Sequence, residues 1–109
     1  NRKKPLDSWR IPVDDNFRKI INRDSVQFVK SDQNIVLYFS ILIMSSGELI
    51  TGDAFTKMQP TITRSEYGWE FKGAKQAGKE VLICAFSFKN DDDKDLMKDL
   101  FEGIVYTGN

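Results

Sequence analysis

Residues 81–88 read VLICAFSF and residues 91–106 read DDDKDLMKDLFEGIVY, and these two segments decide the predicted fold. The first is an apolar run rich in β-branched and aromatic residues, and its length favours a strand over a buried helix. Side chains of a strand alternate between its two faces, and here both faces are largely apolar. Such a strand is typical of the centre of a sheet that is covered on both sides.

The second segment has helical spacing. Its apolar residues recur at i, i+1, i+4, i+5, i+8 and i+9 and form one stripe, made of Leu96, Met97, Leu100, Phe101, Ile104 and Val105. Asn90 to Asp93 provide a capping residue and acidic charge at the positive end of the helix dipole, and Gly108 is the expected end. We therefore predict a C-terminal helix that packs on the strand.

The remaining apolar segments predict further strands. Pro12 confines a first strand over residues 9–13 to an edge, because proline donates no ladder hydrogen bond. Residues 17–21 fit a strand or a turn, and residues 61–64 an extended segment or a loop. Hairpins are predicted at 25–30 with 35–44 and at 69–75 with 81–88, and a short helix at 53–58 ends before Pro60.

These elements predict an α+β fold. Turn-sized gaps between successive strands imply mainly antiparallel pairing, because parallel crossovers need a dozen or more residues. The central sheet is expected to be covered by the C-terminal helix and the shorter helix, as in a sandwich. With 109 residues the chain is expected to form one domain over residues 8–109, with residues 1–7 as a basic tail or tether.

Composition excludes several classes of function. Sixteen basic and sixteen acidic residues give formal neutrality, which argues against a nucleic-acid-binding protein. The absence of histidine removes Ser-His-Asp and Cys-His catalysis and histidine-ligated zinc. Cys84 is the one cysteine, and a lone thiol inside an apolar strand favours a small core residue over a nucleophile.

The chain begins with Asn1 instead of methionine, so we expect a processed or trimmed product. No apolar run approaches the roughly 18 residues that a membrane span needs. The sequence leaves the compartment open between a cytoplasmic location and an extracytoplasmic one, reached after loss of a signal or lipid anchor upstream. The oligomeric state is open as well.

Three places resemble the PsbP-like fold, which the extrinsic oxygen-evolving protein of photosystem II shares with a nuclear-import Ran-binding factor. They are the opening Trp9-Arg10-Ile11-Pro12-Val13 with Phe17 after it, the meander from Ser25 to Met44, and the Gly68-Trp69 hairpin with the terminal helix. Members of that fold are generally non-enzymatic binding or assembly proteins. The resemblance therefore implies a binding role, and it carries over no functional residue.

The acidic residues after the central strand match positions 1, 3, 5, 9 and 12 of an EF-hand loop: Asp91, Asp93, Asp95, Asp99 and Glu102. Leu96 occupies position 6, where the calcium loop requires glycine, and the apolar stripe requires a helix. We therefore expect an acidic helix face and no metal or other cofactor.

Aromatic residues provide the candidate binding sites. Tyr67 and Trp69 could form a recognition platform, and so could Trp9 beside Arg10, although tryptophan is more often packed in the core. No catalytic set is recognisable, so we predict a non-enzymatic module that binds or assembles with a protein partner. The alternative is a small extracytoplasmic carrier that holds an apolar ligand between sheet and helix.

Overall fold

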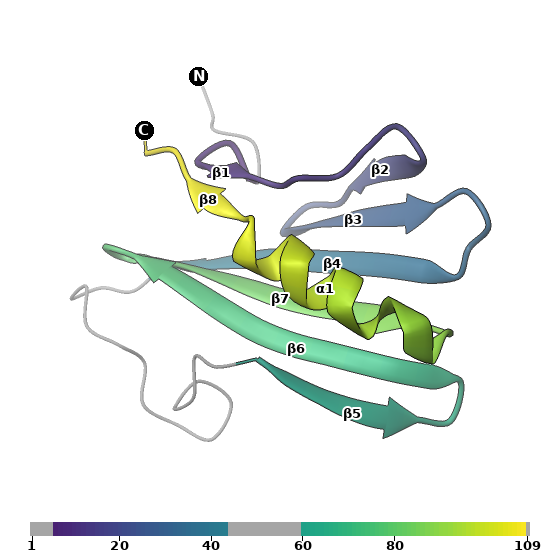
Figure 1. The fold of residues 1–109 in the computed structure, drawn as a ribbon. Coiled ribbons are helices and arrows are strands. Elements are labelled where there is room, and N and C mark those ends of the chain that lie inside the picture. Colours follow the sequence, from purple (N-terminus) through teal and green to yellow (C-terminus); the bar gives the residue numbers. More distant parts are fainter. Residues whose placement is uncertain (1–5, 44–59, 109) are drawn as a thin grey trace.

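The computed structural model describes residues 6–43 and 60–108. In these residues, six strands form one antiparallel sheet in the order β2-β3-β4-β7-β6-β5, and β1 pairs with β8 in a separate two-stranded sheet (Figure 1). The strands are β1 (Trp9–Arg10), β2 (Phe17–Ile21), β3 (Ser25–Lys30), β4 (Ile35–Ile43), β5 (Thr61–Ser65), β6 (Gly68–Ala77), β7 (Glu80–Phe88) and β8 (Val105–Tyr106). A 3-10 helix, η1 (Asp91–Asp93), leads into α1 (Lys94–Glu102). The predicted α+β class, with a central antiparallel sheet and a C-terminal helix, is confirmed.

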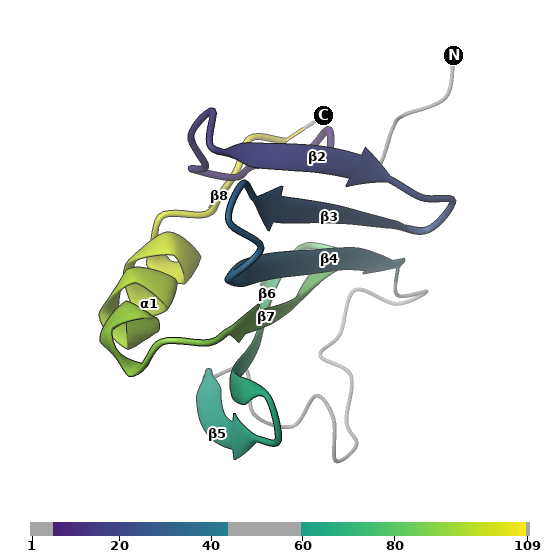
Figure 2. The ribbon, with the colours of Figure 1, turned by 90° about the vertical axis from the view of Figure 1, so that its right-hand side faces the viewer.

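The core lies between α1 and one face of the sheet. Figure 1 shows α1 in front of β4, β7 and β6, and Figure 2, turned by 90°, shows α1 to one side of the strands. The strand with two apolar faces, β7, lies at the centre of the sheet, as the sequence predicts, and β4 is its neighbour there. Phe86 of β7 lies opposite Leu37 and Phe71, and its ring stacks on Phe71 with centroids 5.0 Å apart. Phe101 of α1 closes on the same ring at 5.2 Å, so the sheet and the helix share one aromatic core.

The opposite face carries a smaller apolar cluster. Ala74 and Val81 are buried there, and Leu42 and Ile83 are half-buried beside them. The shorter helix that the sequence places at 53–58 lies outside the described residues.

The helix is shorter than the apolar stripe predicts. It ends at Glu102 with Gly103 as its C-cap, whereas the spacing continues to Val105 and points to Gly108. Val105 belongs to β8 and is 52% exposed, and Leu96, at the flank of the stripe, is 46% exposed. No side-chain hydrogen bond caps the start of η1 or α1. Within the described residues, no helix is long and apolar enough to cross a membrane.

The short first strand joins the two ends of the chain. The sequence predicts a strand over residues 9–13, but pairing is confined to Trp9 and Arg10, which lie opposite Tyr106 and Val105. Trp9 is 6% exposed and packs its ring on Tyr106 with centroids 5.0 Å apart. Leu6, which the sequence assigns to the tail, is also buried in the core.

Candidate functional site

One row of side chains crosses the sheet on the face turned away from α1. The strand registers place Arg18, Val29, Val36, Ser87 and Glu70 side by side on five neighbouring strands. Each alternates with residues of its own strand that face the helix, which fixes the direction of its side chain. At about 4.8 Å between strands, the row spans about 19 Å.

Two open grooves lie along this row and meet at Gln33. We call them together the trough. The first has a volume of about 350 Å³ and the second about 470 Å³. The first is lined by Gln33, Asn34, Val36, Ser65, Tyr67, Trp69, Glu70, Ser87, Phe88 and Lys89. The second is lined by Asp15, Asn16, Phe17, Arg18, Val29, Lys30, Ser31 and Gln33.

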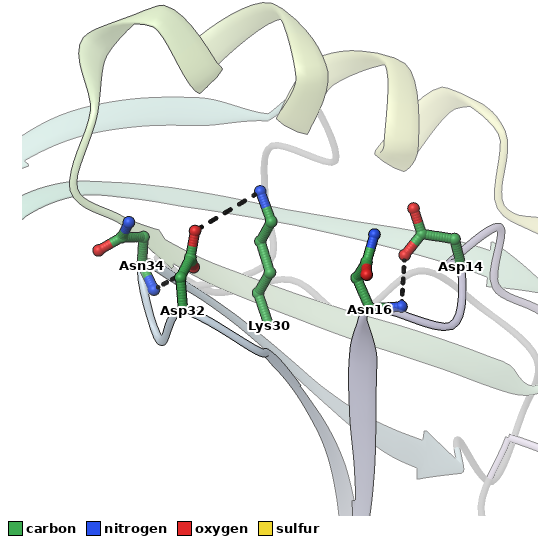
Figure 3. A network of polar contacts seen from close by, with 5 residues as sticks. All are labelled: Asp14, Asn16, Lys30, Asp32 and Asn34. Atoms are coloured by element: carbon green, nitrogen blue, oxygen red, sulfur yellow. Dashed lines mark hydrogen bonds and ion pairs between the residues drawn. The ribbon is translucent and has the colours of Figure 1, made fainter.

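The turn between β3 and β4 separates the two grooves and is held by its own hydrogen bonds (Figure 3). The Asn34 N–H donates to Asp32 Oδ1 over 2.9 Å, and the Gln33 N–H donates to the Lys30 carbonyl over 2.7 Å. Lys30 Nζ lies 3.9 Å from Asp32 Oδ2. Gln33 has a φ of 62°, in the left-handed region. The turn is therefore held by contacts within its own residues.

Backbone hydrogen bonds tie this turn to both neighbouring segments. The Ser31 N–H donates to the Asn16 carbonyl over 2.8 Å, and the Lys89 N–H donates to the Asn34 carbonyl over 3.1 Å. Asn16 is itself fixed by an N–H bond to Asp14 Oδ1 over 2.9 Å, which Figure 3 also shows. The trough is thus lined by strands of the sheet and by turns that backbone hydrogen bonds tie to them, so binding there requires little ordering of the chain.

Trp69 lines the end of the first groove, but its register opposite Phe88 directs its indole ring to the face of the sheet that carries α1, where two cations contact it. Lys94 Nζ lies 3.6 Å from the centroid of the indole ring, and Arg64 Cζ lies 5.1 Å from it. Lys94 is in turn ion-paired with Asp91 Oδ1 over 2.7 Å. These contacts connect the edge strand β5, the start of α1 and the indole, and cation–π attraction holds the ring in place.

Tyr67 projects beside Trp69 from the turn between β5 and β6. Its side chain is 82% exposed, the highest exposure of any large apolar residue in the described chain. The turn is fixed by Gly68, which has a φ of 148° and lies against β7. A Cβ on Gly68 would lie 2.5 Å from the Phe88 carbonyl oxygen, so this approach requires glycine.

The structure separates the four aromatic and basic residues that the sequence nominates. Tyr67 and Trp69 line one groove, whereas the Trp9 Nε1–H donates to Glu80 Oε1 over 3.1 Å. Glu80 pairs with Ala77, eight residues along β6 from Trp69, which is about 26 Å at the rise of a strand. Arg10 is exposed near Trp9. Trp9 therefore belongs to the core at the far end of the sheet.

The described residues provide little for covalent or metal chemistry. Burial raises the pKa of the Cys84 thiol from 9.0 to about 12, an effect that the positive charge of Lys75 only partly offsets, so the thiol stays protonated at neutral pH. Residues 6–43 and 60–108 contain no group of three or more acidic, histidine or cysteine side chains placed to hold a metal ion. The EF-hand register falls on η1 and α1, a helical segment.

Sequence reasoning misses most of the trough. Gln33, Asn34 and Ser87 lie in it because of turn geometry and cross-strand register, and hydroxyl and amide residues give no local signal of a site. The turn cluster at 31–34 is recognisable in the sequence, but its position beside Tyr67 is not.

Comparison with models of protein families, with curated proteins and with solved structures finds no match. The PsbP-like resemblance therefore stays a prediction.

Proposed function

We propose that the chain is a non-catalytic module that recognises a protein partner through the trough. The observation that carries this proposal is the exposed Tyr67 at the end of an open groove that Trp69 also lines. Tyrosine, tryptophan and arginine are the residues that dominate binding energy at protein interfaces. Large apolar side chains that a protein exposes at a preformed groove favour an interaction role.

The lining of the trough suits a peptide segment. Beyond the aromatic end, its walls carry amide and hydroxyl side chains from Asn16, Ser31, Gln33, Asn34, Ser65 and Ser87. Such groups both donate and accept hydrogen bonds, as the backbone of a bound segment requires. The row of about 19 Å matches an extended segment of about six residues.

The carrier of an apolar ligand has less support. It would need space between sheet and helix, where Phe71 instead packs on both Phe86 and Phe101 at centroid distances of 5.0 and 5.2 Å. Leu82 and Met97 are fully buried in the same core.

Capture of partners from native extract tests the proposal, with the wild type and three variants as immobilised baits. Tyr67→Ala removes the exposed ring, and Ser87→Trp fills the floor of the trough from an exposed position. We expect a saturably bound protein whose capture falls at least about tenfold with either variant, as for an interface hot spot. Ile43→Ala is the matched control, because Ile43 is an exposed apolar residue opposite Glu80 at the far end of the sheet.

Two outcomes contradict the proposal. Either no protein is captured saturably, or the variants at Tyr67 and Ser87 capture it as well as Ile43→Ala does. Urea denaturation of each bait establishes that it is folded.

A further inference from the structure

The sheet has two edges in the described part of the chain, and they differ in how well they are protected. β2 and β5 each pair with one neighbour among these residues, β3 and β6 respectively. An edge strand carries unpaired backbone N–H and C=O groups and invites another strand. β2 carries two adjacent exposed cations, Arg18 and Lys19, which are a common means of blocking such pairing.

β5 lacks that protection. Its sequence is TITRS, with three β-branched residues and no lysine or proline. Its one charge, Arg64, lies over the indole of Trp69. Ser65 and Gly68 flank the tight turn at residues 66–67 and pair with each other. Because hydrogen-bonded and non-hydrogen-bonded pairs alternate along an antiparallel ladder, the backbone N–H and C=O groups of Ile62 and Arg64 point away from β6. These groups are directed to where a further antiparallel strand would pair.

We propose that β5 pairs with β5 of a second copy of this chain, in an antiparallel register centred on Thr63. Pairing over the full strand sets Thr63 opposite itself, Ile62 opposite Arg64 and Thr61 opposite Ser65. The centred Thr–Thr pair is favourable across a sheet, and no like charges meet. The same full-length pairing of β2 would set Lys19 opposite Lys19, which is unfavourable.

The pairing has a consequence for the trough. Thr63 lies opposite Glu70 and so extends the cross-strand row of the trough to the edge of the sheet. A two-fold axis at Thr63 therefore aligns the rows of two copies in one continuous sheet. Self-association through β5 does not depend on the proposed partner binding. A five-residue edge is short, so the dimer belongs among weak, transient interfaces.

Disulfide trapping tests the register. In an antiparallel pair the Cα atoms of a non-hydrogen-bonded pair lie about 4.5 Å apart, within the range that a disulfide spans. Thr63→Cys is therefore expected to form a covalent dimer under mild oxidation. Cys84 does not compete, because it is 1% exposed and its pKa is raised to about 12.

Thr61→Cys is the matched control, on the same edge and with the same original residue. In the proposed register the two copies of residue 61 lie about 13 Å apart, four residues along the strand, and cannot bond. We expect Thr63→Cys to cross-link at least about tenfold faster than Thr61→Cys, because pairing raises the effective thiol concentration. Equal rates would overturn the register.

A second measurement uses sedimentation of the purified chain at high concentration. Thr63→Lys places two lysines on the axis and is expected to weaken dimerisation at least about tenfold. Mixing Thr63→Lys with Thr63→Glu should restore it. A wild-type chain that stays monomeric at millimolar concentration, or a Thr63→Lys variant that dimerises like the wild type, overturns the inference. Either result holds whether or not the trough binds a partner.

Discussion

Gly68 shows how a single residue places the most exposed side chain of the candidate site. Its φ of 148° and the 2.5 Å that would separate a Cβ from the Phe88 carbonyl oxygen both exclude a larger residue. We expect Gly68→Ala to lower the free energy of unfolding by about 2–4 kcal/mol, from backbone strain and from displacement of β7. Urea denaturation measures this cost. Because Gly68 fixes the turn that carries Tyr67, capture of the partner should weaken as well.

Gly78 provides the control for this prediction. Its φ is 61°, also in the left-handed region, but a Cβ there would meet no atom within 4 Å. Gly78→Ala should therefore cost only the backbone term, about 1–2 kcal/mol. If both alanines cost the same, the close contact with β7 has no energetic weight.

At the scale of elements, α1 is held at its C-terminal end by a lysine from the sheet. Lys75 Nζ of β6 donates to the carbonyl of Ile104 over 2.9 Å and to that of Glu102 over 3.4 Å. It also lies 4.9 Å from the centroid of the Phe101 ring. A cation at this place satisfies carbonyls that the end of a helix leaves unpaired and matches the helix dipole.

We expect Lys75→Met to lower the free energy of unfolding by about 1–2 kcal/mol, because methionine keeps an apolar stem but loses the charge and both hydrogen bonds. Urea denaturation measures the loss, and amide exchange in the last turn of α1 should accelerate. Lys72→Met on the same strand is the control, since its ion pair with Glu70 over 3.4 Å lies at the surface and should contribute at most about 0.5 kcal/mol. A larger effect at Lys72 would contradict this account of the helix end.

At the scale of the whole molecule, local patterns identify the centre of the fold better than its ends. The strands β4 and β7 are recognisable because both faces of each are apolar, and their central positions follow. The end of α1 is not recognisable, because Ile104 and Val105 keep the helical spacing. The helix ends at Gly103, and the residues after it pair with β1 in β8, a contact between segments almost a hundred residues apart.

The candidate site divides in the same way. Tyr67 and Trp69 can be nominated from residue type and a turn signal in the sequence. Ser87 and Val36 cannot, because the trough arises from the register between strands, and a shift by one residue would move every side chain to the other face. Trp9 is also a tryptophan, and the sequence nominates it for binding as it does Trp69. The fold instead buries Trp9, which donates a hydrogen bond to Glu80, 71 residues away along the chain.

The two tryptophans should therefore differ in what they contribute. Trp9→Ala removes a buried ring, its contact with Tyr106 and its hydrogen bond to Glu80, and we expect a loss of about 3–5 kcal/mol in the free energy of unfolding. Trp69→Ala removes a half-buried ring and two cation–π contacts, and about 1–2 kcal/mol is expected. Urea denaturation separates the two, and capture assays should show the reverse order, with binding lost in Trp69→Ala and kept by folded Trp9→Ala. Equal stability costs would contradict the difference in packing between the two rings. Binding that depends on Trp9 alone would place the recognition surface at the β1–β8 end of the molecule instead of at the trough.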